Sequence, residues 1–118
     1  MAFPKPKPVT VYFGQVVADR LEVRKQVGIA GSTLLDPAPS QRVRNHSPTG
    51  FNWGYAGSGP AQLALGLLLD HTGDADEAER YHQAFKNRFV ANWPGQRPWR
   101  LTSSDIRLWL SEQRLRDH

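Results

Sequence analysis

The chain has 118 residues, of which 39% are hydrophobic and 10% aromatic, a length that suits one globular domain with one core. It contains no cysteine, which excludes disulfides, zinc–thiolate sites and a thiol nucleophile. The net charge of +4 permits phosphate-bearing partners without requiring them. No apolar run approaches the ~20 residues that cross a bilayer, so we expect a soluble cytoplasmic protein that makes no membrane contact.

The N-terminal part of the chain predicts an extended arm and then strands. Residues 1–8 hold three prolines and two lysines, which favour an extended basic arm, and we expect residues 9–118 to form a single α+β domain. Residues 9–17 are β-branched and aromatic, and residues 20–29 alternate at period two, as strands do. A third short strand is expected over residues 32–35. Together they predict a small antiparallel sheet with one solvent-exposed face.

Residues 36–50 contain three prolines and several turn-forming residues, which predicts an irregular loop. The loop carries Arg42, Arg44 and His46 directly before a glycine-rich segment. Long loops are more often functional than short connections, so this region is the first candidate for a site.

Three helices are expected in the second half of the chain. The first, Pro60 to His71, is apolar on nearly every side and therefore belongs at the centre of the fold. The second, Asp74 to Trp93, opens on a D-x-x-E cap and carries one apolar stripe. The third opens on a similar cap at residues 102–105. The sequence thus predicts an α+β fold in which a small antiparallel sheet, formed by the N-terminal half, packs against about three α-helices, one of them central and apolar.

The stretch GFNWGYAGSGPAQLALGLLL, residues 50–69, matches no known phosphate-binding or nucleophile motif. A Walker A loop would need a lysine and a hydroxyl where Pro60 and Ala61 stand, and a dinucleotide fingerprint would need glycine at Gln62. The segment Gly57-Ser58-Gly59 lacks the flanking glycines of a nucleophile elbow.

Two interpretations of this stretch remain open. Amides at the start of a helix are unpaired and carry a partial positive charge, and glycines allow a ligand to approach them. A ligand-binding site would then combine backbone, aromatic rings and loop side chains, namely Arg42, Arg44, His46, Trp53, Tyr55, Gly57, Ser58 and Gly59. Alternatively, the glycines serve tight docking of the helix, the two aromatic rings pack in the core, and the arginines are solvated.

The sequence contains no convincing catalytic set. The four histidines lack ligand spacing, and the carboxylates near helix starts are explained by capping. Among the histidines, His46 is the candidate for a functional role, because a histidine in this loop could orient a ligand or transfer a proton. It could equally cap a turn. We therefore expect neither an enzyme, nor a metal site, nor a cofactor.

The run NHSPTGFNWGYAGSGPAQLALGLLLD, Asn45 to Asp70, resembles a small family of uncharacterised domains in bacteria and their phages. The family pattern is roughly NHSP-x-GF-x-WGY-x-GSGPAQLALALL, followed by an F-K pair that Phe85-Lys86 matches. Ala56 and Gly66 stand where relatives often have glycine and alanine. The resemblance covers most of the chain from about Tyr12, and it implies a phage or mobile-element context without implying an activity.

These observations favour a small non-catalytic binding protein that acts in counter-defence, by binding a nucleotide-like ligand or a host defence protein. One alternative is a protein-interaction module, with a homodimer among its arrangements, that occludes a partner such as a CRISPR-type effector through its charged C-terminal helix or its sheet edge. The other is weak nucleic-acid binding through the basic arm and the arginines of the last helix, which the acids among those arginines make less favourable.

Overall fold

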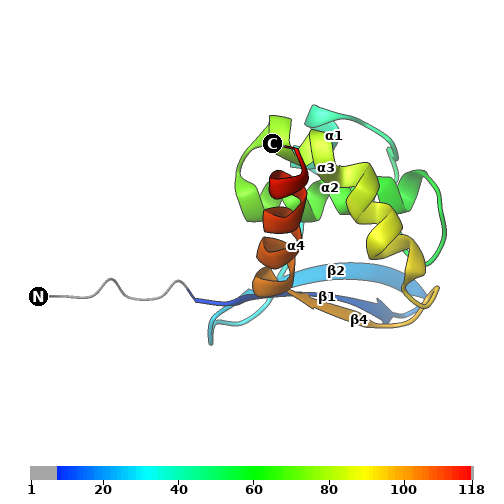
Figure 1. Cartoon of the computed structure of the whole chain (residues 1–118). Helices are drawn as coiled ribbons and strands as arrows, with labels where there is room; N and C mark the ends of the chain where they lie inside the picture. Colours follow the sequence, from blue (N-terminus) through cyan, green and yellow to red (C-terminus); the bar gives the residue numbers. More distant parts are fainter. Residues whose placement is uncertain (1–7, 118) are drawn as a thin grey trace, which may run out of the picture.

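Within residues 8–117, four strands and four helices form two layers, in which the helices cover one face of the sheet (Figure 1). The computed structural model describes these residues, so nearly all of the predicted basic arm, residues 1–8, lies outside the described part. The elements in chain order are β1 (Thr10–Val17), β2 (Arg20–Val27), β3 (Thr33–Leu34), α1 (Ala38–Val43), α2 (Ser58–Thr72), α3 (Ala75–Arg88), a 3-10 turn (Val90–Asn92), β4 (Trp99–Thr102) and α4 (Ser103–Arg116). The predicted α+β class is confirmed.

The sheet is antiparallel throughout and has the strand order β3-β2-β1-β4. β1 and β2 form a hairpin in which Val17 lies opposite Arg20. Its turn residues Ala18 and Asp19 have φ angles of 49° and 63°, the left-handed conformation that the tightest hairpin turns require. The fourth strand comes from the C-terminal half of the chain. Sequence alone does not reveal it, because four residues are too few to show a period of two.

One face of the sheet is buried and the other is open, because side chains alternate along each strand. Tyr12, Val23 and Leu101 point toward the helices, and each has an exposed fraction of 5% or less. Phe13 and Arg100, which lie opposite each other on β1 and β4, belong to the other face. No helix of the described residues covers that face (Figure 1). The prediction of a sheet with one exposed face is confirmed.

Gly14 of β1 allows the indole of Trp99 to lie directly against the strand. A Cβ atom at Gly14 would be 2.1 Å from Trp99 Nε1, which is closer than real Cβ contacts come. Trp99 also stacks on Trp93, with ring centroids 4.0 Å apart, and meets Trp53 edge-on at 5.8 Å. This tryptophan cluster fixes β4 against β1 and against the helical layer.

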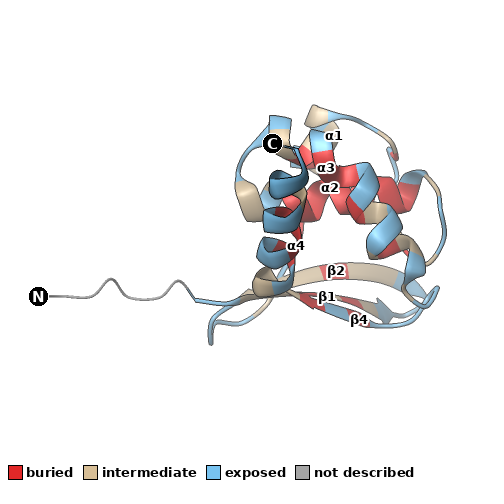
Figure 2. Ribbon diagram, in the orientation of Figure 1, coloured by how far each residue is buried: buried red, intermediate tan, exposed pale blue. Residues whose placement is uncertain are grey.

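α2 is the central helix of the fold (Figure 2). Gly57 precedes its first turn, and Gly73, with a φ of 67°, ends it in the left-handed conformation. Its fully buried apolar side chains are Leu63, Ala64, Leu65, Leu67 and Leu68. The prediction of a helix buried on all sides is therefore confirmed. Among the described residues, no helix is long and apolar enough to cross a membrane.

α3 and α4 begin at the predicted caps. The Asp74 side chain accepts a hydrogen bond from the Glu77 amide, and Thr102 and Asp105 form a reciprocal capping box. α3 ends at Arg88, and a 3-10 turn follows, so the prediction that this helix runs to Trp93 is wrong at its C-terminal end. The apolar spacing continues through the turn because the turn also packs on the core.

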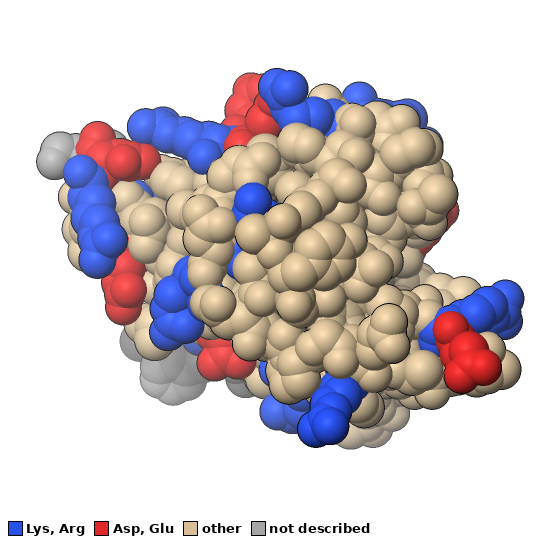
Figure 3. Space-filling model, turned by 90° about the vertical axis from the view of Figure 1, so that its right-hand side faces the viewer, with Lys and Arg blue, Asp and Glu red and all other residues tan. Residues whose placement is uncertain are grey.

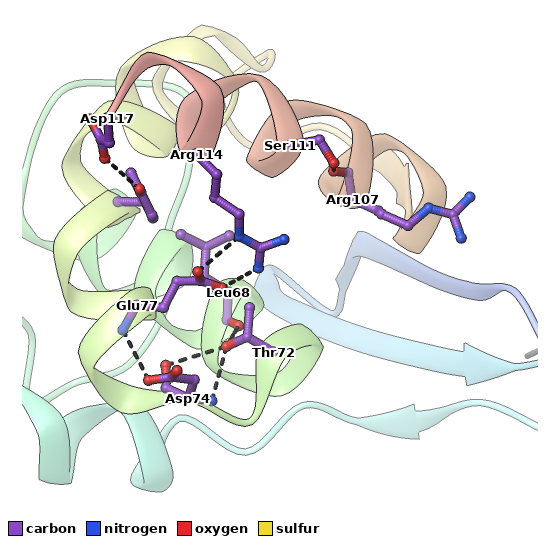
Figure 4. Close-up of polar contacts among 9 residues, drawn as sticks. Leu68, Thr72, Asp74, Glu77, Arg107, Ser111, Arg114 and Asp117 are labelled. Carbon is purple, nitrogen blue, oxygen red and sulfur yellow. Dashed lines mark hydrogen bonds and ion pairs between the residues drawn. The ribbon is translucent and has the colours of Figure 1, made fainter.

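α4 is attached to α3 by a polar contact near the C-terminus (Figure 4). Arg114 Nε donates to Glu77 Oε2 at 2.9 Å. Glu77 therefore takes part both in the cap of α3, through its amide, and in the contact with α4, through its carboxylate. Arg107, two turns earlier on the same face of α4, has a guanidinium that extends from the helix without reaching the other labelled residues (Figure 4). Such half-exposed ion pairs contribute about 1 kcal/mol or less, so they orient α4 more than they stabilise it.

The segment of residues 36–50 is only partly irregular, because it contains the short helix α1. Asp36 Oδ1 accepts a hydrogen bond from the Ala38 amide at 2.9 Å and so supports the first turn. Pro37 and Pro39 stand at the start of this helix, where a missing amide hydrogen costs nothing. The prediction of a wholly irregular loop is wrong, because these prolines begin a helix and do not prevent one.

Candidate functional site

A buried glutamine of α2 holds the loop that precedes the glycine-rich turn. Gln62 is fully buried, and its Oε1 accepts the amides of His46 and Ser47 at 2.7 and 3.0 Å. Its Nε2 donates to Ser40 Oγ at 2.9 Å and to the carbonyl oxygen of Arg44 at 3.2 Å. One side chain therefore pairs with four polar groups close to the core. The loop is anchored to α2 at this point.

His46 continues this network to α3. Its Nε2 lies 2.9 Å from Nε2 of His82, whose Nδ1 lies 2.6 Å from the Glu79 carbonyl oxygen. A carbonyl only accepts, so His82 Nδ1 carries a hydrogen, His82 Nε2 accepts from His46, and His46 Nδ1 remains an acceptor. His82 is 3% exposed. The pair therefore connects the loop to α3. Of its four ring nitrogens, His46 Nδ1 alone has no hydrogen-bond partner within residues 8–117 and could exchange a proton.

The environment keeps both histidines neutral. Burial is the main cause that lowers the pKa of His46, and the neighbouring His82 and the cation of Arg44 lower it further. Burial also lowers the pKa of His82, against the opposing effect of its hydrogen bond to Glu79. The Arg44 guanidinium binds the Glu79 carboxylate, so the predicted site residue Arg44 is already paired within the protein. Arg42, in α1, is exposed.

The glycines of the turn before α2 are required by close packing. Gly54 has a φ of 87°, and a Cβ there would be 2.5 Å from Gly95 Cα, while its amide donates to Val90 at 3.0 Å. A Cβ at Gly57 would meet the Tyr55 ring at 2.5 Å, and one at Gly59 would meet Asn52 at 2.6 Å. The packing agrees with the interpretation that these glycines allow tight docking, and of the three only Gly54 has a positive φ.

The two aromatic residues of the turn have different environments. Trp53 is 1% exposed and donates from Nε1 to the Arg97 carbonyl oxygen at 2.9 Å. For Trp53 the structure agrees with the interpretation that the ring packs in the core, so its predicted place among the ligand-binding residues is corrected. Tyr55 is 48% exposed, and its ring lies on the backbone of Gly57. Only Tyr55 presents an aromatic surface to solvent.

The start of α2 lies on a side of the molecule with few charges. Gly57 precedes the helix without any side-chain cap, and Ser58, the first helical residue, is exposed. Figure 3 views this side, on the right of Figure 1, and most of the surface consists of residues that are neither basic nor acidic. The basic side chains lie mainly toward its margins. A phosphate placed at the start of α2 would therefore find amides but no cluster of arginines.

A groove that sequence reasoning missed lies beside the sheet. It has a volume of about 560 Å³ and is lined by Arg20, Leu21, Glu22, Val23, Leu34, Leu35, Asp36, Pro37, Thr49, Gly50 and Phe51. The signal that could have found it is the Thr49-Gly50-Phe51 part of the motif, together with the shortness of the predicted third strand. Phe51 packs on Gly66, where a Cβ would be 2.8 Å from the ring.

Within residues 8–117, no group of three or more histidine, aspartate or glutamate side chains is arranged to hold a metal ion. A search of curated proteins and one of solved structures each found no match. Residues 14–112 match the model of a family of unknown function, DUF6166, and this span runs from within β1 into α4. The chain therefore belongs to the DUF6166 family.

Proposed function

We propose that this chain is a small non-catalytic binding protein whose partner is another protein. Its contact surface is the exposed part of the glycine-rich turn. The observation that carries this proposal is Tyr55, whose ring is about half exposed yet fixed against the backbone of Gly57. Tyr55 belongs to the turn that leads into α2, and the start of this helix is on the side of the molecule with few charges (Figures 1 and 3).

A fixed tyrosine is well suited to a protein interface. The ring is held over Gly57, and its hydroxyl is 3.1 Å from the position of a Cβ at Gly59. Because these contacts already restrict the side chain, little further rotamer entropy is lost when a partner covers it. Tyrosine combines a large apolar area with one polar group, and charged residues are depleted at the centres of interfaces.

The same geometry makes a nucleotide-like ligand the second candidate. In its favour, α2 begins without a side-chain cap at Gly57, so the amides of Ser58 and Gly59 belong to an uncapped first turn. Against it, Trp53 is in the core and Arg44 is bound to Glu79, which leaves stacking to Tyr55 alone and charge to Arg42. A protein partner needs neither of the missing groups.

The biological setting is also part of the proposal. We take the partner to be a host defence protein, for example a CRISPR-type effector. We further take the chain to be encoded by a phage or mobile element and to act in the host cytoplasm. The support is the resemblance of residues 45–70 to domains in bacteria and their phages. A counter-defence role suits a binding protein that acts by covering a partner.

The proposal is tested by comparing two immobilised variants with the original chain as baits for bacterial lysates. Tyr55→Ala removes the exposed ring, whereas Leu115→Ala removes a side chain that is 76% exposed on α4. We expect a protein that is retained by the original chain and by Leu115→Ala, and lost with Tyr55→Ala. Retention by all three baits alike would place the contact elsewhere and contradict the proposed surface.

The nucleotide alternative is separated by a thermal-shift screen of mono-, di- and cyclic nucleotides. If the partner is a protein, no nucleotide shifts the midpoint of unfolding. A large shift that Tyr55→Ala abolishes, without a captured protein, would instead establish the second candidate. The matched control is again Leu115→Ala, which leaves the start of α2 untouched.

A further inference from the structure

β2 has a free edge next to the hairpin turn. β3 pairs with β2 only at Arg24 and Lys25, and the Leu35 amide then donates to the Val23 carbonyl oxygen at 2.8 Å. Among the described residues, nothing pairs with β2 between Val23 and the turn on this side. In an antiparallel strand, residues two apart direct their backbone groups to the same side. Since Val23 directs its carbonyl to β3, Leu21 directs its N–H and C=O to the open edge.

The space beside this edge is suited to another strand. The groove described above runs along it, and apolar side chains such as Leu35, Pro37 and Phe51 form part of its wall. Unpaired backbone groups next to an apolar groove form a template for strand addition. Leu21 supplies both the backbone groups and an apolar side chain on the inner face of the sheet.

The three residues of this edge are complementary to themselves. The Arg20 side chain is exposed and forms no hydrogen bond or ion pair within residues 8–117. Glu22 Oε2 accepts from Gln15 and lies 3.6 Å from the Arg24 guanidinium, so Glu22 Oε1 is left to face a partner. Arg20 and Glu22 flank Leu21 on the outer face of the sheet. When such a segment lies antiparallel to its own copy, each arginine meets a glutamate. A sequence with like charges at these two positions would repel its copy.

We propose that the Arg20–Leu21–Glu22 edge of β2 pairs antiparallel with the same edge of a second copy of this chain. A two-fold axis passes through Leu21, which exchanges two N–H···O=C bonds with the partner's Leu21. Arg20 lies opposite the partner's Glu22, and Glu22 lies opposite the partner's Arg20. The two four-stranded sheets become one continuous sheet, and the two leucine side chains meet at the grooves.

The register of this pairing is fixed. Arg20 and Glu22 direct their backbone groups to β1, where Val17 and Gln15 are their partners. Of the three residues Arg20, Leu21 and Glu22, only Leu21 therefore directs its N–H and C=O to the open side, and a shift by one residue would lose both bonds. Because β3 occupies the position opposite Val23, the partner strand ends there. A short, charge-matched edge of this kind predicts a reversible, salt-sensitive dimer.

The test is sedimentation velocity of the full chain over a concentration series, with charge reversals at the edge. Arg20→Glu and Glu22→Arg each place like charges opposite one another twice in the dimer, and each should weaken dimerisation about tenfold or more. The double variant Arg20→Glu/Glu22→Arg restores opposite charges and should return the dissociation constant close to that of the original chain. Arg116→Glu, at an exposed position of α4, is the control for net charge.

A second measurement locates the contact. The measurement is a series of two-dimensional NMR spectra recorded at increasing protein concentration. The resonance of the Leu21 amide should shift, and this amide should become protected from exchange. The Val27 amide is the control, because Val27 lies opposite Thr10 at the far end of the hairpin, and its resonance should not shift. A monomer at every concentration would overturn the proposal and leave the edge to an extended segment of another protein. Dimerisation that the single reversals leave unchanged would overturn it as well, because the contact would then lie elsewhere. Circular dichroism of each variant shows whether it is folded.

Discussion

The two ends of the glycine-rich motif are held to the protein by different forces. Asn45 to Ser47 are attached to α2 and α3 by hydrogen bonds that converge on Gln62 and His82, both almost fully buried. Gly54 to Gly59 are held by close contact of backbone with backbone and with the Tyr55 ring. The first region therefore depends on polar groups being paired, and the second depends on the absence of side-chain volume. Substitutions in the two regions should therefore lower the stability of the protein for different reasons and by different amounts.

The largest effect is expected at Gln62. Gln62→Leu conserves size but leaves the His46 and Ser47 amides, the Arg44 carbonyl and the Ser40 hydroxyl without this partner. Unpaired buried groups predict a loss of about 3–5 kcal/mol in the free energy of unfolding. Urea unfolding measures it, with Gln83→Leu at an exposed position of α3 as the matched control. Equal losses in the two variants would show that the network does not stabilise the fold.

A somewhat smaller effect is expected at the glycine turn. Gly54→Ala introduces a Cβ 2.5 Å from Gly95 Cα at a residue with a φ of 87°, so the two backbone segments must separate. The expected loss is about 2–3 kcal/mol in the free energy of unfolding. The control is Gly31→Ala, because nothing lies within 4 Å of a Cβ there. If both substitutions are tolerated alike, the packing account of the turn is wrong.

The smallest effect, and the one that distinguishes the regions most directly, is the pH dependence. The folded state lowers the pKa of His46 and His82, mainly through burial, with the cations Arg44 and Lys86 acting in the same direction and Glu79 opposing them. In the unfolded chain these histidines have the ordinary pKa of 6.5, so on acidification they bind protons before the folded state does. Their contribution to the free energy of unfolding is therefore fully present above pH 6.5 and is lost as the pH decreases through that value.

Urea unfolding between pH 8 and pH 5 checks this sign, within the range where histidine titrates. The double variant His46→Gln/His82→Gln should show a shallower decrease of stability with falling pH, and His71, whose pKa burial also lowers, should supply the remainder. Gly54→Ala should be less stable by the same amount at every pH, because no titrating group takes part. An unchanged slope in the histidine variant would remove the pair as the source.

The sequence was sufficient for those elements whose signals are local. The buried character of α2, the caps at Asp74 and Thr102, and the strands β1 and β2 all follow from composition and spacing within one segment, and all are confirmed. β4 escaped prediction because its four residues become a strand only through pairing with β1. α1 escaped it because two prolines suggest a break when their place relative to the helix start is unknown.

The candidate site was predictable in part, for the same reason. The motif indicated the region on which the proposed contact surface rests, but the role of each residue depends on partners far away in the chain. His46 meets His82, Arg44 meets Glu79, and Trp53 donates to Arg97. No spacing rule links such positions, so the sequence could not decide which of the predicted residues remain accessible. Tyr55 is accessible and Trp53 is not, although they are two residues apart.

The pairing of β1 with β4 also has a consequence for the way in which the protein acquires its structure during synthesis. Gly14 lies opposite Trp99, so β1 lacks one neighbour until synthesis has passed Trp99 and this residue has left the ribosome. Contacts between residues so distant in the chain form late and slow the search for the native state. Premature termination before Trp99 would leave β1 with an unprotected flank, and such a fragment is a natural substrate for chaperones and proteases.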